Sequence, residues 1–77
     1  SRPLSTLRPR EHATITQVRA SDPALLRYLE KIGLQPGTPV EALEYSPFDQ
    51  TLVLQVAGYQ PKTLGLAITR QIFIEAQ

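Results

Sequence analysis

The residue types that carry out catalysis are few in this chain, and their spacing matches no catalytic arrangement. His12 is the single histidine and cysteine is absent, so the chain alone lacks the imidazole and thiolate ligands of a protein zinc site. The serines have neither a nucleophile-elbow context nor a general base in a recognisable relation to them; they are Ser1, Ser5, Ser21 and Ser46. We therefore expect no catalytic residues, and we do not expect an enzyme.

Carboxylates and glycines are also scattered rather than grouped. Glu41 and Glu44 stand three apart in a predicted strand, so we expect their side chains to point to opposite faces. The four glycines, at positions 33, 37, 58 and 65, form no glycine-rich phosphate loop. Neither a carboxylate pair nor a nucleotide site is predicted.

Three aromatic residues are candidates for protein binding. Domains that bind proline-rich strands use a groove of exposed aromatic side chains. Tyr45, Phe48 and Tyr59 lie on or near predicted loops, where they could line such a groove. The alternative is that they belong in part to the core, and the sequence leaves both interpretations open.

Composition bounds the size and the class of the protein. A chain of 77 residues with 42% hydrophobic residues suits one small domain with its own core. A domain that binds DNA by neutralising phosphates usually carries a clear excess of basic residues, and the net charge of +1 is smaller than that. Without cysteine, signal peptide or long apolar run, a cytoplasmic location is expected. The absence of methionine suits a processed protein and also a domain cut from a longer chain, and we favour the second.

The first ten residues differ from the rest. Arg2, Arg8 and Arg10 alternate with Pro3 and Pro9, which predicts a linker or arm at 1–10 before a domain at 11–77. A solvated lead-in is favoured over a nucleic-acid-binding arm, because arms of that kind carry longer basic runs.

A strand and a helix are predicted next. Residues 12–19 are rich in β-branched residues with imperfect alternation, which indicates a strand with a bulge or strong twist. Asp22 is a suitable N-cap for a helix whose first position is Pro23. The predicted apolar face of this helix consists of Leu25, Leu26, Leu29 and Ile32. Gly33 should end the helix with a positive φ, and Leu34 should fold back onto the last turn.

The remainder is predicted to be β-structure joined by tight turns. Two hairpin strands are expected at 39–46 and 51–57, an extended stretch at 62–66, one helical turn at 67–69 and a last strand at 71–75. The fold class is therefore mostly β: a small barrel of about five strands with one short α-helix inserted after the first strand. We expect that helix to cover one end of the barrel.

Several stretches resemble a known family. The sequence "LLRYLEKIGLQPGTPVEALEYSPFD", followed by "LVLQV", Leu64-Gly65, Ala67 and "IFI", is similar to the FeoA domain. The resemblance covers roughly Leu4 to Glu75, and it implies a small SH3-like barrel. Such domains occur alone in bacterial ferrous iron uptake and as the C-terminal domain of metal-dependent repressors of the DtxR/MntR type. The stretch "SDPALLRYLEKIGL" is more similar to the repressor-borne form.

The resemblance implies a non-catalytic regulatory role. In a repressor, the partners would be the other domains of the same protomer and its dimer mate, with DNA bound only by a separate winged-helix domain. Fe²⁺ or Mn²⁺ is implied for the full-length protein, and no cofactor for this domain alone. The alternatives are a stand-alone FeoA-type protein that assists a membrane ferrous iron transporter, and a peptide-binding module.

The same resemblance bears on one candidate metal ligand. In iron-dependent repressors, the start of this helix supplies a carboxylate and, three residues on, an amide to an ancillary metal site. These positions fall on Asp22 and Leu25 here, and leucine cannot ligate. The N-cap role is therefore favoured for Asp22 over the metal role.

Overall fold

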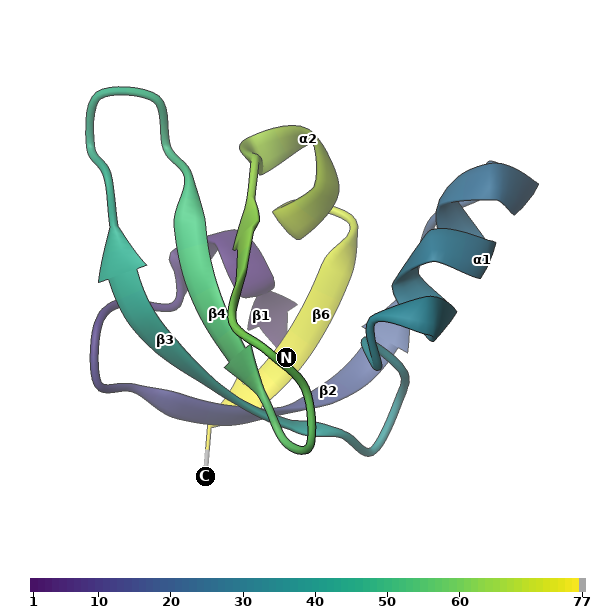
Figure 1. Ribbon diagram of the computed structural model, residues 1–77, viewed down its shortest axis with the longest axis horizontal. Coiled ribbons are helices and arrows are strands. Elements are labelled where there is room, and N and C mark those ends of the chain that lie inside the picture. The colour runs from purple at the N-terminus through teal and green to yellow at the C-terminus, as the bar shows by residue number, and fades with distance from the viewer. Residues whose placement is uncertain (77) are drawn as a thin grey trace.

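The computed structural model describes residues 1–76, which form one antiparallel sheet with helices at its margins (Figure 1). The elements are β1 (Arg2–Pro3), the 3-10 helix η1 (Leu4–Thr6), β2 (His12–Val18), α1 (Pro23–Lys31), β3 (Pro39–Tyr45), β4 (Leu52–Val56), β5 (Lys62–Leu64), α2 (Leu66–Thr69) and β6 (Ile72–Ala76). The strand order is β1-β6-β2-β3-β4-β5, and the bent strands wrap around one core. The predicted mostly-β fold, an SH3-like barrel with one short helix after the first long strand, is confirmed.

The first ten residues contribute to the sheet and to the core. β1 pairs with β6 through Arg2↔Ile74 and Pro3↔Phe73. Leu4 and Leu7, which follow it, are 0% exposed. The segment that we expected as a linker or arm therefore includes a sixth strand and two core leucines. The reason is that single apolar residues among arginines and prolines show no periodicity, so only packing reveals their burial.

Bulges bend two of the long strands. In β2 the pairing with β6 shifts register between Ile15 and Gln17, as the imperfect alternation predicted. In β3 the pairing with β4 shifts between Ala42 and Glu44. The second bulge was not predicted from the sequence.

The bulge in β3 corrects the expectation for the two glutamates of that strand. Glu41 pairs with Gln55 and Glu44 with Val53, and these partners are two residues apart on β4. Since residues two apart share a face of a strand, Glu41 and Glu44 lie on the same face rather than on opposite faces. The extra residue, Leu43, restores the shared side and is itself 38% exposed.

The ends of α1 form as the local sequence dictates. Asp22 Oδ1 accepts a hydrogen bond from Ala24 N–H at 2.9 Å, and Pro23 takes the first helical position. At the other end, Leu34 N–H donates to Leu29 O at 2.8 Å and Gly33 N–H donates to Glu30 O at 3.1 Å. Together with the φ of +86° at Gly33, these bonds make a Schellman motif. The predicted helix stop is confirmed.

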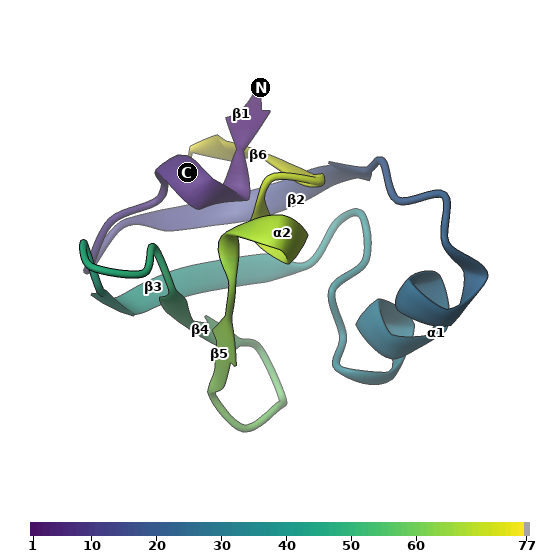
Figure 2. The same ribbon diagram turned by 90° about the horizontal axis from the view of Figure 1, so that it is seen from above.

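The packing of α1 is lighter than its apolar face suggests. Leu29 is the buried residue of the helix at 1% exposed, and Ile32 and Leu34 continue into the core just beyond it. Leu26 and Tyr28 remain 39% and 42% exposed. Seen from above, α1 stands beside the barrel near the end of β2, and α2 lies closer to its middle (Figure 2). The helix therefore packs against the barrel mainly through its C-terminal half and the residues just after it.

The core is one apolar cluster filled from every strand longer than two residues. Along β4 the residues Leu52, Leu54 and Val56 point inward, and along β6 Ile72 and Ile74 do the same. Both alternations match the predicted strand faces. Packing of this core fixes the positions of the surface loops and of the boundary between α1 and β2. The candidate sites lie in these places.

Candidate functional sites

The three aromatic candidates do not come together in one groove. Tyr45 ends β3 and Phe48 lies in the turn that follows, whereas Tyr59 lies in the connection between β4 and β5. These two connections are at opposite ends of β4, as Figure 1 shows. A shared proline-rich-peptide groove formed by all three side chains is therefore not present in this arrangement.

Two of the aromatic rings have intramolecular partners. The guanidinium carbon of Arg8 lies 3.7 Å from the centroid of the Tyr45 ring, a cation–π contact that ties the N-terminal segment to β3. The Tyr59 ring lies directly over Gly33, so closely that an added Cβ there would overlap it. Gln55 Nε2 also donates to Tyr59 O at 2.7 Å and holds the backbone of that turn.

Phe48 is different, because its side chain is 96% exposed at the tip of the β3–β4 hairpin. Asp49 organises this tip by accepting hydrogen bonds from Thr51 Oγ1 at 2.9 Å and Thr51 N–H at 3.2 Å. Both bonds lower the pKa of Asp49 below its ordinary value of 3.8, and the bond from the Thr51 side chain has the larger effect. A single exposed aromatic ring is a protein-binding candidate, but here it stands without neighbouring apolar walls.

Asp22 is an exposed N-cap in the structure. Its carboxylate accepts a hydrogen bond from Ala24 N–H. Leu25, at the position of the implied amide ligand, is half-buried. Among residues 1–76 no group of three or more His, Cys, Asp or Glu side chains could hold a metal ion. The residues of this domain alone therefore do not fit an Fe²⁺ or Mn²⁺ site.

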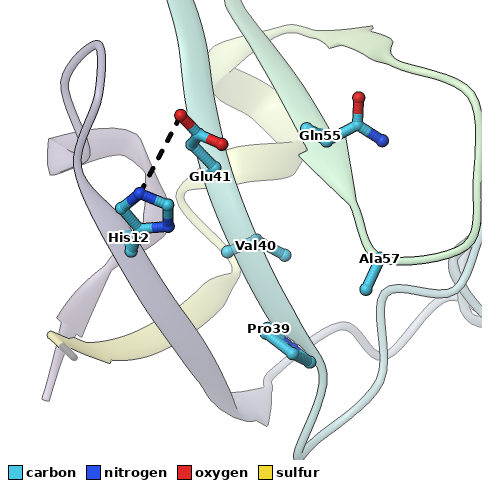
Figure 3. A pocket seen from close by; sticks show the side chains of 6 residues that line it. All are labelled: His12, Pro39, Val40, Glu41, Gln55 and Ala57. Carbon is cyan, nitrogen blue, oxygen red and sulfur yellow. Dashed lines mark ion pairs between the residues drawn. The ribbon is translucent and has the colours of Figure 1, made fainter.

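His12 lies in an open hollow of about 170 Å³ on the outer face of the sheet. His12, Glu41 and Gln55 occupy directly paired positions on β2, β3 and β4, and His12 Nε2 is 3.9 Å from Glu41 Oε2 (Figure 3). The amide of Gln55 donates instead to Val56 O and Tyr59 O. The hollow thus brings one base and one carboxylate together, without a nucleophile or a third ligand beside them.

A second recess lies between α1 and the end of β2. Its volume is about 250 Å³, and its lining consists of Val18, Leu26, Leu29, Glu30, Leu34, Gln35 and Pro36. This recess was not predicted from the sequence. The available signal was the width of the apolar face of α1, which includes both Leu25 and Leu26 and is wider than a single row of core contacts requires.

The structure is a small SH3-like barrel, and its candidate sites lie in surface recesses and loops. The family model of the FeoA domain matches residues 2–76. The chain belongs to the FeoA domain family. No helix within residues 1–76 is both long and apolar enough to span a bilayer.

Solved structures with this fold include longer and domain-sized proteins. A manganese-dependent transcriptional repressor has a TM-score of 0.90 at 21% identity, over 99% of this chain and 41% of the repressor chain. The crystal structure of the iron uptake regulatory protein FeoA has a TM-score of 0.82 at 19% identity, over 97% of this chain and 96% of that one. The crystal structure of ScaR with bound Zn²⁺ has a TM-score of 0.80 at 31% identity, over 97% of this chain and 36% of that one.

These similarities at 19% and 21% identity show the fold alone. This chain spans 41% of the first of these relatives, so it corresponds to one part of that longer protein. Among curated protein sequences no significant match was found.

Proposed function

We propose that this chain is a non-catalytic regulatory domain, the C-terminal FeoA domain of a cytoplasmic metal-dependent repressor of the DtxR/MntR type. It would pack against the other domains of its own protomer and against the dimer mate, and so modulate activation by Fe²⁺ or Mn²⁺. DNA would be bound by a winged-helix domain outside this chain.

The observation that carries the proposal is the match to one part of a longer repressor. The TM-score to the manganese-dependent repressor, 0.90, is higher than the 0.82 to the FeoA protein of similar length. ScaR, which was crystallised with Zn²⁺ and of which this chain spans 36%, is more similar in sequence than that FeoA protein, at 31% against 19% identity. The repressor-like stretch "SDPALLRYLEKIGL" points in the same direction.

The distribution of charge and ligands supports an accessory role. A net charge of +1 supplies little phosphate neutralisation, and residues 1–76 contain no group of three or more His, Cys, Asp or Glu side chains placed to hold a metal ion. Both DNA and metal would therefore be bound mainly elsewhere in the longer protein. Asp22 could contribute one carboxylate to an ancillary site shared with other domains, while its Oδ1 accepts the N-cap bond.

The alternative function is that of a stand-alone FeoA-type protein that assists a membrane ferrous iron transporter. The FeoA structure favours it, because this chain covers 96% of that protein. The two functions differ in what is encoded before Ser1. A helix-turn-helix domain in the same reading frame is the expected result, and an initiation codon directly before Ser1 would reverse the assignment.

The repressor function also predicts a difference between two protein forms. Metal-dependent DNA binding should be measurable for the full-length protein, and removal of residues 1–77 should change the metal concentration at which half of the DNA is bound. If the deletion leaves that midpoint and the dimer affinity unchanged, the regulatory role is wrong.

A further inference from the structure

The recess between α1 and β2 has an apolar interior and an open mouth. Val18 forms one wall, and Leu26, Leu29 and Leu34 form the other. Leu26 is 39% exposed, although it lies on the apolar face of the helix. The volume of about 250 Å³ suits one large apolar side chain together with part of its neighbours. An apolar side chain that displaced water from these leucine and valine walls would bury apolar surface.

One wall of the recess ends in an open strand edge. β2 pairs with β3 only over His12–Thr14, and Ile15 then exchanges hydrogen bonds with Gly37 and Thr38. On its other side β2 continues to pair with β6 as far as Val18. Within the described residues, the last part of β2 therefore has a strand neighbour on the β6 side alone.

The backbone of Val18 is oriented towards this open edge. Arg19 N–H donates to Gln71 O, at the start of β6, at 2.7 Å. Successive residues of an antiparallel strand direct their backbone groups to opposite sides, so the N–H and C=O of Val18 face away from β6. An N–H and C=O pair at a sheet edge is a template for one more extended chain.

The chemistry of the recess specifies what that chain should carry. Glu30 is the charged residue of the lining, so a lysine or arginine beside the apolar anchor would be complementary to it. α1 lies near the end of β2 (Figure 2), and the recess between them has Val18 on the strand side and Leu26 and Leu29 on the helix side. Domains that bind peptides by strand addition combine these same elements, a strand edge and a pocket for one side chain.

We propose that the recess between α1 and β2 binds an extended segment of another polypeptide, which pairs with the backbone of Val18, inserts one large apolar side chain between Val18 and Leu26, and places a basic residue near Glu30. This site does not depend on whether the domain belongs to a repressor or acts alone. It differs in place and chemistry from a groove formed by Tyr45, Phe48 and Tyr59.

The test is an NMR titration of the ¹⁵N-labelled chain with the peptide acetyl-Thr-Val-Leu-Val-Lys-Thr-amide. We expect saturable shifts at the amides of Val18, Leu26 and Leu34, together with slower hydrogen exchange at Val18. A peptide with proline in place of the central leucine lacks both the anchor and an N–H, and should bind at least about tenfold more weakly. A peptide with glutamate in place of lysine should also bind more weakly, because it would repel Glu30.

Two matched variants locate the site. Leu26→Glu places a charge at the mouth of the recess and should reduce affinity at least about tenfold. Leu66→Glu is the control, because Leu66 is 37% exposed on α2 and lies outside the recess. It should bind like the unaltered chain. Glu30→Gln changes no packing, and should weaken binding of the lysine peptide but not of a peptide with glutamine at that position.

Several results would overturn the proposal. They are no saturable shifts at millimolar peptide, shifts centred on Phe48 or His12, equal loss of binding in the Leu26 and Leu66 variants, and equal affinity for the proline peptide. A fifth is concentration-dependent self-association in sedimentation that Leu26→Glu abolishes, because the recess would then hold a second copy of this chain.

Discussion

Two features at position 33 disfavour every residue that has a Cβ atom. The φ of +86° at Gly33 lies in the left-handed region, where side chains with a Cβ are strained. In addition, the Tyr59 ring occupies the space into which a Cβ would project. Gly37 has a similar φ of +92°, but nothing lies within 4 Å of the Cβ position there. The two glycines therefore separate backbone strain from a steric clash.

We predict that Gly33→Ala lowers the free energy of unfolding by more than Gly37→Ala, which should cost about 1 kcal/mol from the positive φ alone. The additional cost comes from displacement of the half-exposed Tyr59 ring, and Gly33→Val should cost at least as much. Urea denaturation measures both values. In a Tyr59→Ala background the difference between the two glycine variants should disappear, and a difference that persists would contradict the role of the ring.

Thr69 has an unmet hydrogen-bonding group. It is 1% exposed, and its Oγ1 is buried without a partner in the described structure. Thr69→Val replaces the hydroxyl with a methyl group of the same shape, so we predict that it raises the free energy of unfolding by about 1 kcal/mol. Thr63→Val, at an exposed position of β5, is the control and should change it by less than about 0.5 kcal/mol. Destabilisation by Thr69→Val would indicate a partner for the hydroxyl.

Asp49 makes stability depend on acid pH. Its pKa in the folded chain is lowered below 3.8 by the hydrogen bonds from Thr51. The carboxylate therefore contributes stability above its unfolded pKa, and this contribution is lost as the pH falls through the lower, folded-state pKa. We predict that Thr51→Val raises the pKa of Asp49 towards its ordinary value, as measured by NMR titration of the carboxyl carbon. An unchanged pKa would mean that the Thr51 hydroxyl does not act on Asp49.

At the scale of elements, α1 combines well-formed ends with light packing. Its N-cap and Schellman motif depend on residues within one turn, whereas its attachment to the barrel depends chiefly on Leu29 and the residues just after the helix. In the N-terminal half of its apolar face, Leu25 packs against the core, whereas Leu26 lines the recess. This division leaves a helix that is held firmly at one end and can present Leu26 to a partner.

Two leucine-to-alanine substitutions in α1 should reveal the division. Leu29→Ala removes a side chain that is 1% exposed, and we predict a loss of about 2 to 4 kcal/mol. Leu26→Ala makes the same chemical change at a residue that is 39% exposed, and should cost less than about 1 kcal/mol. Thermal or urea denaturation measures both. Equal losses would mean that Leu26 is packed as firmly as Leu29.

At the scale of the whole molecule, charge and ligand distribution limit what the chain binds alone. Eight basic and seven acidic residues nearly cancel, and the described residues hold no cluster of three metal-binding side chains. The basic residues Arg8 and Arg19 are further engaged with the rings of Tyr45 and Phe73. Within residues 1–76, the near balance of charge and the lack of such a cluster are the reasons to expect weak binding of phosphate and of divalent cations by this domain alone.

We predict that the 77-residue chain binds neither operator DNA nor Mn²⁺, Fe²⁺ or Co²⁺ with useful affinity. Calorimetric titration at low micromolar protein tests the metals. A saturable site with a Kd tighter than about 10 μM, equivalent to about −7 kcal/mol, would contradict an accessory role and direct attention to Asp22 and His12. The full-length protein should bind metal in the same titration, because it would supply the missing ligands.

Local residue chemistry determined the elements of this protein. The Asp22-Pro23 start, the Gly33 stop, the alternation in β4 and β6 and the bulge in β2 all depend on residues within a few positions of each other. Backbone preference and periodicity act over that range, so they predicted these features and a small barrel built from them. The SH3-like form of the barrel was implied by the resemblance to the FeoA domain.

Tertiary packing decided what depends on distant residues. Leu4 and Leu7 show no period within their arginine- and proline-rich segment, and only the space left beside β6 makes them core. The bulge at Leu43 follows from pairing with β4, and it places Glu41 and Glu44 on one face.

Tertiary packing also decided where the candidate sites lie. Tyr45, Phe48 and Tyr59 are separated because the two ends of β4 lie apart, whereas the recess arises where α1 and the turn after it lie beside the end of β2. Such proximity is a property of the closed barrel, because no pair of neighbouring residues encodes it.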